Sequence, residues 1–245
     1  MMDQDTKSLL ASLKQLSQKG PIKVRSKSSN AIGKILQNEL GIVHNTKHKN
    51  CLHGYTISSK TKSRPNLFAS VPNWSKSKFK SSTEVVNEIG KANLEKNYQR
   101  ALFCTVSARG PNSFGLYLKY NKEHATIEEW LETKHVNECI LVWNIEKLKS
   151  KLSSIGKRAL ITATPVDLSG TRGVHFRYVE LVEEPELEKF IELIESGAIT
   201  LDHLISLKQG ANTAREQGPM FKIAPQAVEL LHGPVKKIDL MDIPV

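Results

Sequence analysis

The order of helix-like and strand-like patterns is the feature that most constrains the fold of this chain. Apolar residues recur at helical spacing over residues 6–19 and 30–40, and several strand patterns then follow with few helices between them. Further helices are expected over residues 81–89, over residues 186–195 and after Pro225. Strands are expected at residues 54–60, 66–71, 101–107, 114–120, 139–143, 158–164 and 175–181. This irregular order does not suit a barrel or a Rossmann sheet, and it predicts an α/β fold with a mixed β-sheet flanked by helices.

The length and the cysteine content set the class of protein. A chain of 245 residues with 39% hydrophobic residues can bury a core as one large domain, or as one domain with two lobes. Three cysteines without paired spacing suit a reducing compartment. The sequence starts with no signal-peptide pattern and contains no apolar stretch long enough to span a bilayer. We therefore expect a cytoplasmic protein without a membrane partner.

Positive charge is concentrated in the first third of the chain. Residues 1–83 hold 15 Lys or Arg against three Asp or Glu, whereas the remaining residues hold 20 against 22. No carboxylate occurs between Glu39 and Glu84. Such a segment would attract a polyanion, and the phosphate backbone of nucleic acid is the first candidate in the cytoplasm. A lysine-rich surface that only keeps the protein in solution is the alternative.

The segment NCLHGYTISSK, residues 50–60, contains the most informative strand. Side chains alternate between the two faces of a strand, so Tyr55 and Ile57 point to one side. Thr56, Ser58 and Lys60 point to the other side. We expect the first face to pack against a core and the second to face a cleft.

An ordered series of motifs resembles the MvaI/BcnI-type restriction endonucleases, relatives of the MutH nicking enzyme within the PD-(D/E)xK nuclease fold. The resemblance begins with NAIGKILQNELGI, continues through NCLHGYTISSKTKSRPNLFASVPNW, and returns more weakly in LIESGAITLDHLI and REQGPMFKI. It implies a restriction-endonuclease-like domain over residues 1–245. If there are two lobes, residues 1–100 or so would form the nuclease-like core segment. Residues from about 101 to 245 would then form the remaining core and a recognition lobe.

The resemblance also implies where catalytic groups would lie. Family members hold Mg²⁺ with carboxylates and use a lysine, and their strand reads P-D-x-x-G-x-E-x-K. The helix glutamate falls on Gln37, the metal-binding aspartate on Cys51, the second acid on Thr56 and the lysine on Ser58. All four positions depart from the pattern, and an amide, a thiol and two hydroxyls are poor ligands for Mg²⁺. The resemblance therefore predicts a nuclease scaffold without ordinary metal-dependent cleavage, and no cofactor.

Three alternatives would keep a catalytic role. Lys60, on the same strand face as Ser58, could replace the lysine, although no acid makes a matching shift. A serine nucleophile at Ser58 or Ser59 would need further groups that the sequence does not supply. A loose cluster of histidines and one cysteine could hold Zn²⁺, although its spacing matches no known finger. That cluster consists of His44, His48, Cys51 and His53.

Basic residues outside the catalytic positions are the candidates for contacts to DNA. Lysines alternate with serines in SKSKFKSS, which suits phosphate contacts. REQGPMFK, by the resemblance, approaches base edges, where an arginine could pair with guanine. The predicted DNA-binding residues are Lys60, Lys62, Arg64, Lys76, Lys78, Lys80, Arg215 and Lys222.

Three functions follow from these observations. The favoured one is a pseudo-nuclease that binds double-stranded DNA and serves as a recognition, allosteric or partner subunit in restriction or DNA processing. Such a protein would act as a monomer, or as a hetero-oligomer with an active nuclease subunit. The second is an active type II restriction endonuclease with relocated catalytic groups and Mg²⁺. The third is a protein-interaction module that uses its basic surface for an acidic partner.

Overall fold

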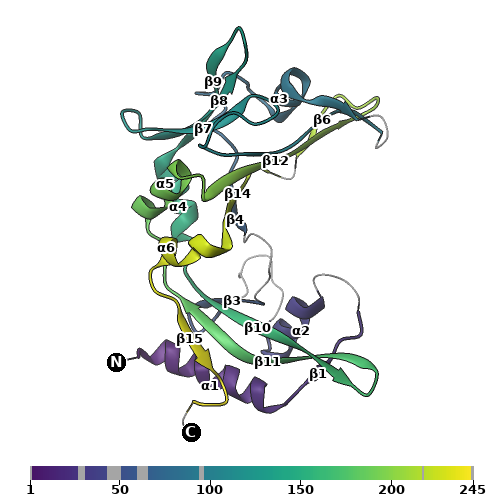
Figure 1. Ribbon diagram of the computed structural model, residues 1–245, viewed down its shortest axis with the longest axis vertical. Coiled ribbons are helices and arrows are strands. Elements are labelled where there is room, and N and C mark those ends of the chain that lie inside the picture. The colour runs from purple at the N-terminus through teal and green to yellow at the C-terminus, as the bar shows by residue number, and fades with distance from the viewer. Residues whose placement is uncertain are drawn as a thin grey trace. The chain divides into compact units, whose positions relative to one another are not determined.

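The computed structural model describes residues 2–26, 31–42, 51–59, 66–93, 97–216 and 218–243. The chain forms two compact units (Figure 1). Unit 1 consists of Met1–Ser63, Ile155–Pro185 and His232–Val245, and unit 2 consists of Arg64–Ser154 and Glu186–Leu231. Both units contain residues from both sides of position 100, where the sequence analysis places a division between lobes. The assignment of one domain to the whole chain stays a prediction.

Unit 1 is built on a mixed six-stranded sheet in the order β1-β11-β10-β3-β2, with β15 also paired to β11. The strands β3 and β10 are parallel, and the other pairs of this sheet are antiparallel. The strands are β1 (Ile22–Lys23), β2 (Cys51–Leu52), β3 (Tyr55–Ser59), β10 (Lys157–Leu168), β11 (Thr171–Val182) and β15 (Lys236–Asp239). The prediction of a mixed sheet is confirmed.

Two helices accompany this sheet, α1 (Gln4–Gln18) and α2 (Ala31–Glu39), as the apolar spacing predicted. The Asp3 carboxylate caps α1 by accepting a hydrogen bond from the Thr6 amide at 2.7 Å. Leu9 and Leu13 of α1 are fully buried in one core with Ile57 of β3. Burial of this apolar stripe, rather than helix propensity, fixes α1 against the sheet.

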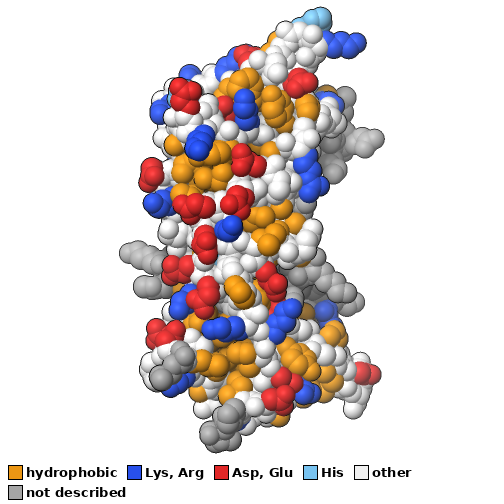
Figure 2. All heavy atoms as spheres, turned by 60° about the vertical axis from the view of Figure 1, so that its left-hand side comes forward, with side chains coloured by type: hydrophobic (Ala, Val, Ile, Leu, Met, Phe, Trp, Pro, Cys, Tyr) orange, Lys and Arg blue, Asp and Glu red, His pale blue; other side chains and the backbone are white. Residues whose placement is uncertain are grey.

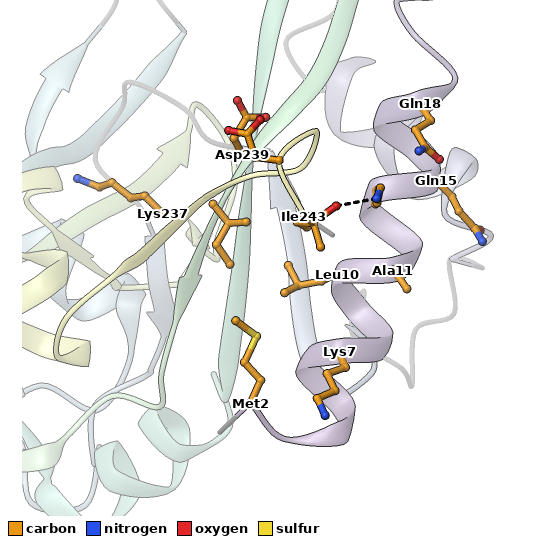
Figure 3. Close-up of a pocket in the computed structure, with 12 residues that line it drawn as sticks. Met2, Lys7, Leu10, Ala11, Gln15, Gln18, Lys237, Asp239 and Ile243 are labelled. Atoms are coloured by element: carbon orange, nitrogen blue, oxygen red, sulfur yellow. Dashed lines mark hydrogen bonds between the residues drawn. The ribbon is translucent and has the colours of Figure 1, made fainter. Parts of the chain in front are cut away.

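A groove of about 800 Å³ lies between α1 and the segment that follows β15 (Figure 3). Leu10 and Ile238 contribute apolar surface to it, and the Lys14 ammonium donates a hydrogen bond to the Ile243 carbonyl at 2.6 Å. Lysines and aspartates share its rim, so the groove has no dominant charge. It contains none of the residues that the sequence analysis selected.

Unit 2 contains two sheets, and all of its strand pairs are antiparallel. The larger sheet has the order β4-β14-β12-β6-β5, with β13 paired to β12, and the smaller has the order β7-β8-β9. The larger contains β4 (Asn66–Ala69), β5 (Lys91–Asn93), β6 (Tyr98–Val106), β12 (Ile199–Lys208), β13 (Arg215–Glu216) and β14 (Met220–Ile223). The smaller contains β7 (Leu116–Asn121), β8 (Thr126–Glu132) and β9 (Asn137–Asn144).

The helices of this part of the chain are α3 (Ser82–Ile89), α4 (Ile145–Ser153), α5 (Leu187–Glu195) and, after a 3-10 turn at Pro225–Ala227, α6 (Val228–His232). Ser81 caps α3 as expected, because its hydroxyl accepts from the Glu84 amide at 3.2 Å. The return bond differs from a capping box, since the Glu84 carboxylate accepts from the amide of Lys80, one residue before the cap, at 2.9 Å. The sequence patterns did not predict α4, β8, β12 or β14, nor the short strands β1, β2, β5, β13 and β15.

Charged side chains of both signs are interspersed with hydrophobic ones on the face drawn in Figure 2. The positive excess of the sequence therefore does not form a single-sign surface among the described residues visible there. None of the helices within the described ranges is long and apolar enough to cross a lipid bilayer.

Candidate functional site

The β2–β3 hairpin of unit 1 brings two of the four selected positions together. His53 and Gly54 form its turn with φ values of 46° and 76°, the left-handed conformation that two-residue hairpin loops require. Cys51 consequently pairs with Thr56, and the Cys51 Sγ lies 3.6 Å from the Thr56 Oγ1. The Thr56 hydroxyl also donates to the Ile155 carbonyl at 3.3 Å.

The alternation predicted for β3 is confirmed. Tyr55 and Ile57 are 2% and 1% exposed and belong to the core of unit 1. Thr56 and Ser58 are only partly buried and point to the other face of the sheet. The Ser58 Oγ atom is nevertheless buried, and it has no hydrogen-bond partner within the described residues.

The neighbouring strand β10 adds an unexpected residue to this face. In the parallel register of the two strands, Thr56 lies beside Arg158 and Ser58 lies beside Leu160. The Nε atom of Arg158 is buried and also lacks a hydrogen-bond partner. Burial lowers the pKa of the Arg158 guanidinium, and no carboxylate offsets that effect.

The fourth selected position, Gln37, lies on α2 and forms no hydrogen bond with the side chains of Cys51, Thr56 or Ser58. The side chain of Gln37 is buried, and its backbone carbonyl accepts from the Ile42 amide at 2.9 Å, past the end of the helix. The helix packs close to β3, since a Cβ added at Gly33 would lie 3.8 Å from the Ser59 Oγ.

The zinc hypothesis falls partly outside the described residues. His44 and His48 are not described, as is also true of the possible substitute Lys60. Of the remaining pair, Cys51 is exposed and the His53 Nε2 lies 3.4 Å from the Ser12 hydroxyl. Over the described ranges, no group of three or more His, Cys, Asp or Glu side chains is arranged to hold a metal ion.

The three lysines of SKSKFKSS lie within the described residues, whereas Lys62 and Arg64 lie outside them. Ser77 and Phe79 are 2% and 7% exposed, and the three lysines between and beside them are exposed. Lys78 forms an ion pair with a glutamate of β9, and the Lys80 ammonium donates to the Ser77 carbonyl. Lys76 has no such partner in the described part of the chain. Their role in binding stays a prediction.

The two other selected cations lie at the larger sheet of unit 2. Lys222 on β14 forms a partly buried ion pair with Asp202 of β12, with 2.5 Å between Nζ and Oδ2. Arg215 on β13 is exposed and pairs in register with Ser206. Lys222 is thus already neutralised by a protein carboxylate, whereas Arg215 is open to solvent. Contacts of both to DNA stay predictions.

Unit 2 also contains a buried ionisable pair that the sequence analysis missed. The Glu129 carboxylate of β8 and the His203 imidazole of β12 are both fully buried, with 2.8 Å between Oε2 and Nε2. The other carboxylate oxygen and the other ring nitrogen have no partner within the described residues. Burial by itself would lower the pKa of His203, but attraction and hydrogen bonding by Glu129, together with two further carboxylates, raise it. The only signal for this buried pair in the sequence was Glu129 itself, a glutamate within a stretch that could form a strand.

The fold agrees with the comparisons to known proteins. The model of the MvaI/BcnI restriction endonuclease family matches residues 10–232. The chain belongs to this family. Its fold matches a solved complex of restriction endonuclease MvaI with its cognate DNA substrate, at a TM-score of 0.73 and 18% identity over 98% of this chain and 100% of that chain. MvaI in the absence of DNA gives a TM-score of 0.64 and 18% identity over 97% and 99%. No curated protein matches significantly.

The predicted family and fold are therefore confirmed, and the family's usual Mg²⁺ can be tested against this donor set. Mg²⁺ prefers oxygen ligands, chiefly carboxylates, in octahedral geometry. The four positions predicted from the resemblance supply an amide, a thiol and two hydroxyls, and Arg158 lies beside Thr56 on the sheet. These four residues do not fit Mg²⁺, because none of them is a carboxylate that would offset the charge of the ion.

Proposed function

We propose that this chain is a double-stranded DNA-binding member of the MvaI/BcnI family that does not cleave by the metal-dependent route. It would serve as a recognition, allosteric or partner subunit in restriction or DNA processing. One observation carries the proposal: the hairpin that would hold the metal instead has Cys51 Sγ 3.6 Å from Thr56 Oγ1. The nearby hydroxyl of Ser58 has no hydrogen-bond partner among the residues that the structure describes.

Binding to duplex DNA is supported by the family and by the distribution of cations. The structure with the higher TM-score is MvaI in complex with its cognate DNA substrate, and its fold extends over 98% of this chain. Binding without cleavage would still need a basic surface, because phosphate contacts supply most of the affinity. The first third of the chain retains its 15 basic residues although the acids of the catalytic pattern are missing.

Loss of cleavage follows from the chemistry of the reaction. Hydrolysis of a phosphodiester by a restriction endonuclease needs a hard cation to stabilise charge at phosphorus and to activate water. A thiol is a soft ligand, and a hydroxyl carries no charge, so neither Cys51 nor Thr56 replaces a carboxylate. A cytoplasmic location and a partner nuclease subunit belong to the same proposal.

The direct test is selection of bound sequences from a random duplex library, with Mg²⁺ in one arm and EDTA in the other. We expect the same sequences to be recovered in both arms, with intact strands at any excess of protein. Strand breaks that require Mg²⁺ or Mn²⁺ and follow the purified chain would instead support an endonuclease with relocated groups. Absence of duplex binding would favour an acidic protein partner.

A second test asks whether the scaffold still supports the chemistry. The variant Gln37→Glu, Cys51→Asp, Thr56→Glu, Ser58→Lys restores the family pattern on one helix and one hairpin. The matched control carries Cys51→Asn in place of Cys51→Asp, because asparagine has the shape of aspartate without its charge. Slow Mg²⁺-dependent cleavage by the first variant but not by the control would show that only the functional groups are missing.

A further inference from the structure

Arg158 of β10 is the charged residue that lies beside Thr56 on the sheet. Its strand neighbour is Thr56, and Ser58 is the next residue along β3 on the same face. Adjacent strands are about 4.8 Å apart, so the long guanidinium side chain can reach over either hydroxyl. Glu180 lies on this face on the next strand, opposite Leu160, but it does not affect the pKa of Arg158.

A guanidinium with a buried nitrogen that lacks a partner is unfavourable in a protein that has no ligand for it. Buried charged groups in proteins are normally paired, and one without a partner indicates a bound ion, a ligand or a functional role. Arg158 is partly buried, and its Nε atom is buried and has no hydrogen-bond partner within the described residues. The nearby His232 is no substitute, because burial and then the charge of Arg158 lower its pKa and favour the neutral imidazole.

The position of this charge reverses the electrostatics of the site. A metal-dependent relative holds carboxylates here and a cation between them and the phosphate. This chain holds neutral groups at the carboxylate positions and supplies a cation from the sheet itself. A guanidinium binds a phosphate directly through a planar pair of N–H donors. The Ser58 hydroxyl, which has no acceptor in the described part of the chain, can donate to the same group.

We infer that Arg158 and Ser58 form a metal-independent binding site for a phosphate group of the DNA backbone. The inference rests on the proposed function and deepens it, since it names the atoms that replace the metal. Duplex binding at this site needs no divalent ion. The Arg158 guanidinium would then bind the DNA backbone where metal-dependent relatives have their catalytic centre. Its positive charge would also disfavour binding of Mg²⁺ there.

The test compares Arg158→Gln with the control Arg172→Gln, which removes the same charge from an exposed position on β11 of unit 1. We expect Arg158→Gln to weaken duplex binding in EDTA by about tenfold or more, as loss of one charge-assisted contact should. The dependence of log K on log salt should lose about 0.9 in slope, which corresponds to one phosphate. The control should change affinity much less, because exposed charges are screened by salt.

Thermal unfolding without DNA provides an independent measurement. Removal of an unpaired buried charge should raise the melting temperature, so Arg158→Gln should melt higher than wild type. Inorganic phosphate should raise the melting temperature of wild type but not of the variant. A lower melting temperature of Arg158→Gln would show that the guanidinium has a structural partner, and would overturn the inference.

The outcomes separate this inference from the proposed function. Wild-type protein that binds no duplex contradicts the proposed function. Wild type that binds duplex, with Arg158→Gln equal to it in affinity and salt slope, contradicts only the phosphate site. Stabilisation of wild type by inorganic phosphate without duplex binding would assign the site to free phosphate and overturn its assignment to the DNA backbone.

The restored nuclease gives a further readout. Thr56→Glu sets a carboxylate beside Arg158, where an ion pair would compete with Mg²⁺. Adding Arg158→Ala to the four restoring substitutions should therefore increase cleavage over the fourfold variant. Equal or lower cleavage by the fivefold variant counts against an electrostatic role of Arg158 at this site.

Discussion

The buried pair of Glu129 and His203 allows a specific prediction about stability. Substitution of His203 should lower the free energy of unfolding by more than substitution of Glu129. His203→Leu leaves a fully buried carboxylate with neither oxygen paired, which should lower the free energy of unfolding by about 3–5 kcal/mol. Glu129→Leu leaves an imidazole that can become neutral, so the loss should be about 1–3 kcal/mol. The double substitution removes both polar groups and should cost less than the sum of the two.

Urea denaturation followed by tryptophan fluorescence is a suitable assay, because Trp74, Trp130 and Trp143 all lie in unit 2 with this pair. Glu132→Gln is the control, since it neutralises an exposed glutamate at the end of the same strand. The coupling would be refuted by equal losses in the free energy of unfolding for the two single substitutions. It would also be refuted if the loss in the double variant equalled the sum of the two single losses. A control that is as destabilising as either single substitution would refute it as well.

The sign of the pH dependence follows from the raised pKa of His203 in the folded state. Below the unfolded pKa of about 6.5, both states hold the proton and the contribution of the pair is fully present. As the pH rises above this value, the unfolded state loses its proton first, so stability falls until the pH passes the folded pKa. Stability measured between pH 5.5 and pH 8 should decrease in wild type more than in His203→Leu.

Four further predictions concern DNA binding, zinc content and thiol chemistry. Duplex affinity should fall by about 10³ between 50 and 200 mM salt if roughly six phosphates are contacted, and a filter-binding series that shows no salt dependence would contradict this. Lys76→Glu should weaken binding more than Lys78→Glu in the same assay, because Lys78 already has an ion-pair partner. Purified protein should contain no stoichiometric zinc, which elemental analysis with Cys51→Ala as control can check. An aromatic disulfide reagent at pH 8 should modify exposed Cys51 rapidly. Burial and nearby carboxylates raise the pKa of Cys104 and of Cys139 to about 12, which should delay their reaction until unfolding.

The parts of the fold set by local patterns could be predicted from the sequence. The leucine stripe of α1, the Ser81 cap of α3 and the alternation of β3 are all present as expected. The helix α4 was missed although Ile145, Leu148 and Leu152 are buried at helical spacing. Its polar residues and short length gave a weaker signal than the strand before it.

Strands with buried polar residues could not be recognised from alternation. In β8, Glu128 and Glu129 are adjacent and both buried, which contradicts a pattern of one polar face. Glu128 accepts from Trp130 Nε1 at 2.9 Å and from two other side chains, and Glu129 pairs with His203. These partners come from tertiary structure, so the burial was invisible in the sequence.

The candidate site also contains residues that could be placed from the sequence and one that could not. Spacing alone placed Thr56 and Ser58 on one strand face, and the family resemblance placed Cys51 beside them. Arg158 is about a hundred positions away in sequence and enters only through the parallel pairing of β3 with β10. Parallel strands are not joined by a hairpin, so no turn residues in the sequence indicate that they pair. The sequence therefore held no signal that Arg158 lies beside Thr56.

The discontinuous make-up of unit 1 has a consequence for how the chain is synthesised. Its strand β3 emerges from the ribosome long before β10, its partner in the sheet, and Leu240, which is fully buried in its core, emerges later still. Unit 2 is discontinuous as well, because its second segment, Glu186–Leu231, follows β10 and β11, so it is complete only just before the last segment of unit 1 emerges. During translation the polar edge of β3 must remain without its parallel neighbour while some hundred further residues are added. A nascent chain arrested at about residue 150 should therefore be more prone to aggregation, and more dependent on chaperones, than the released protein.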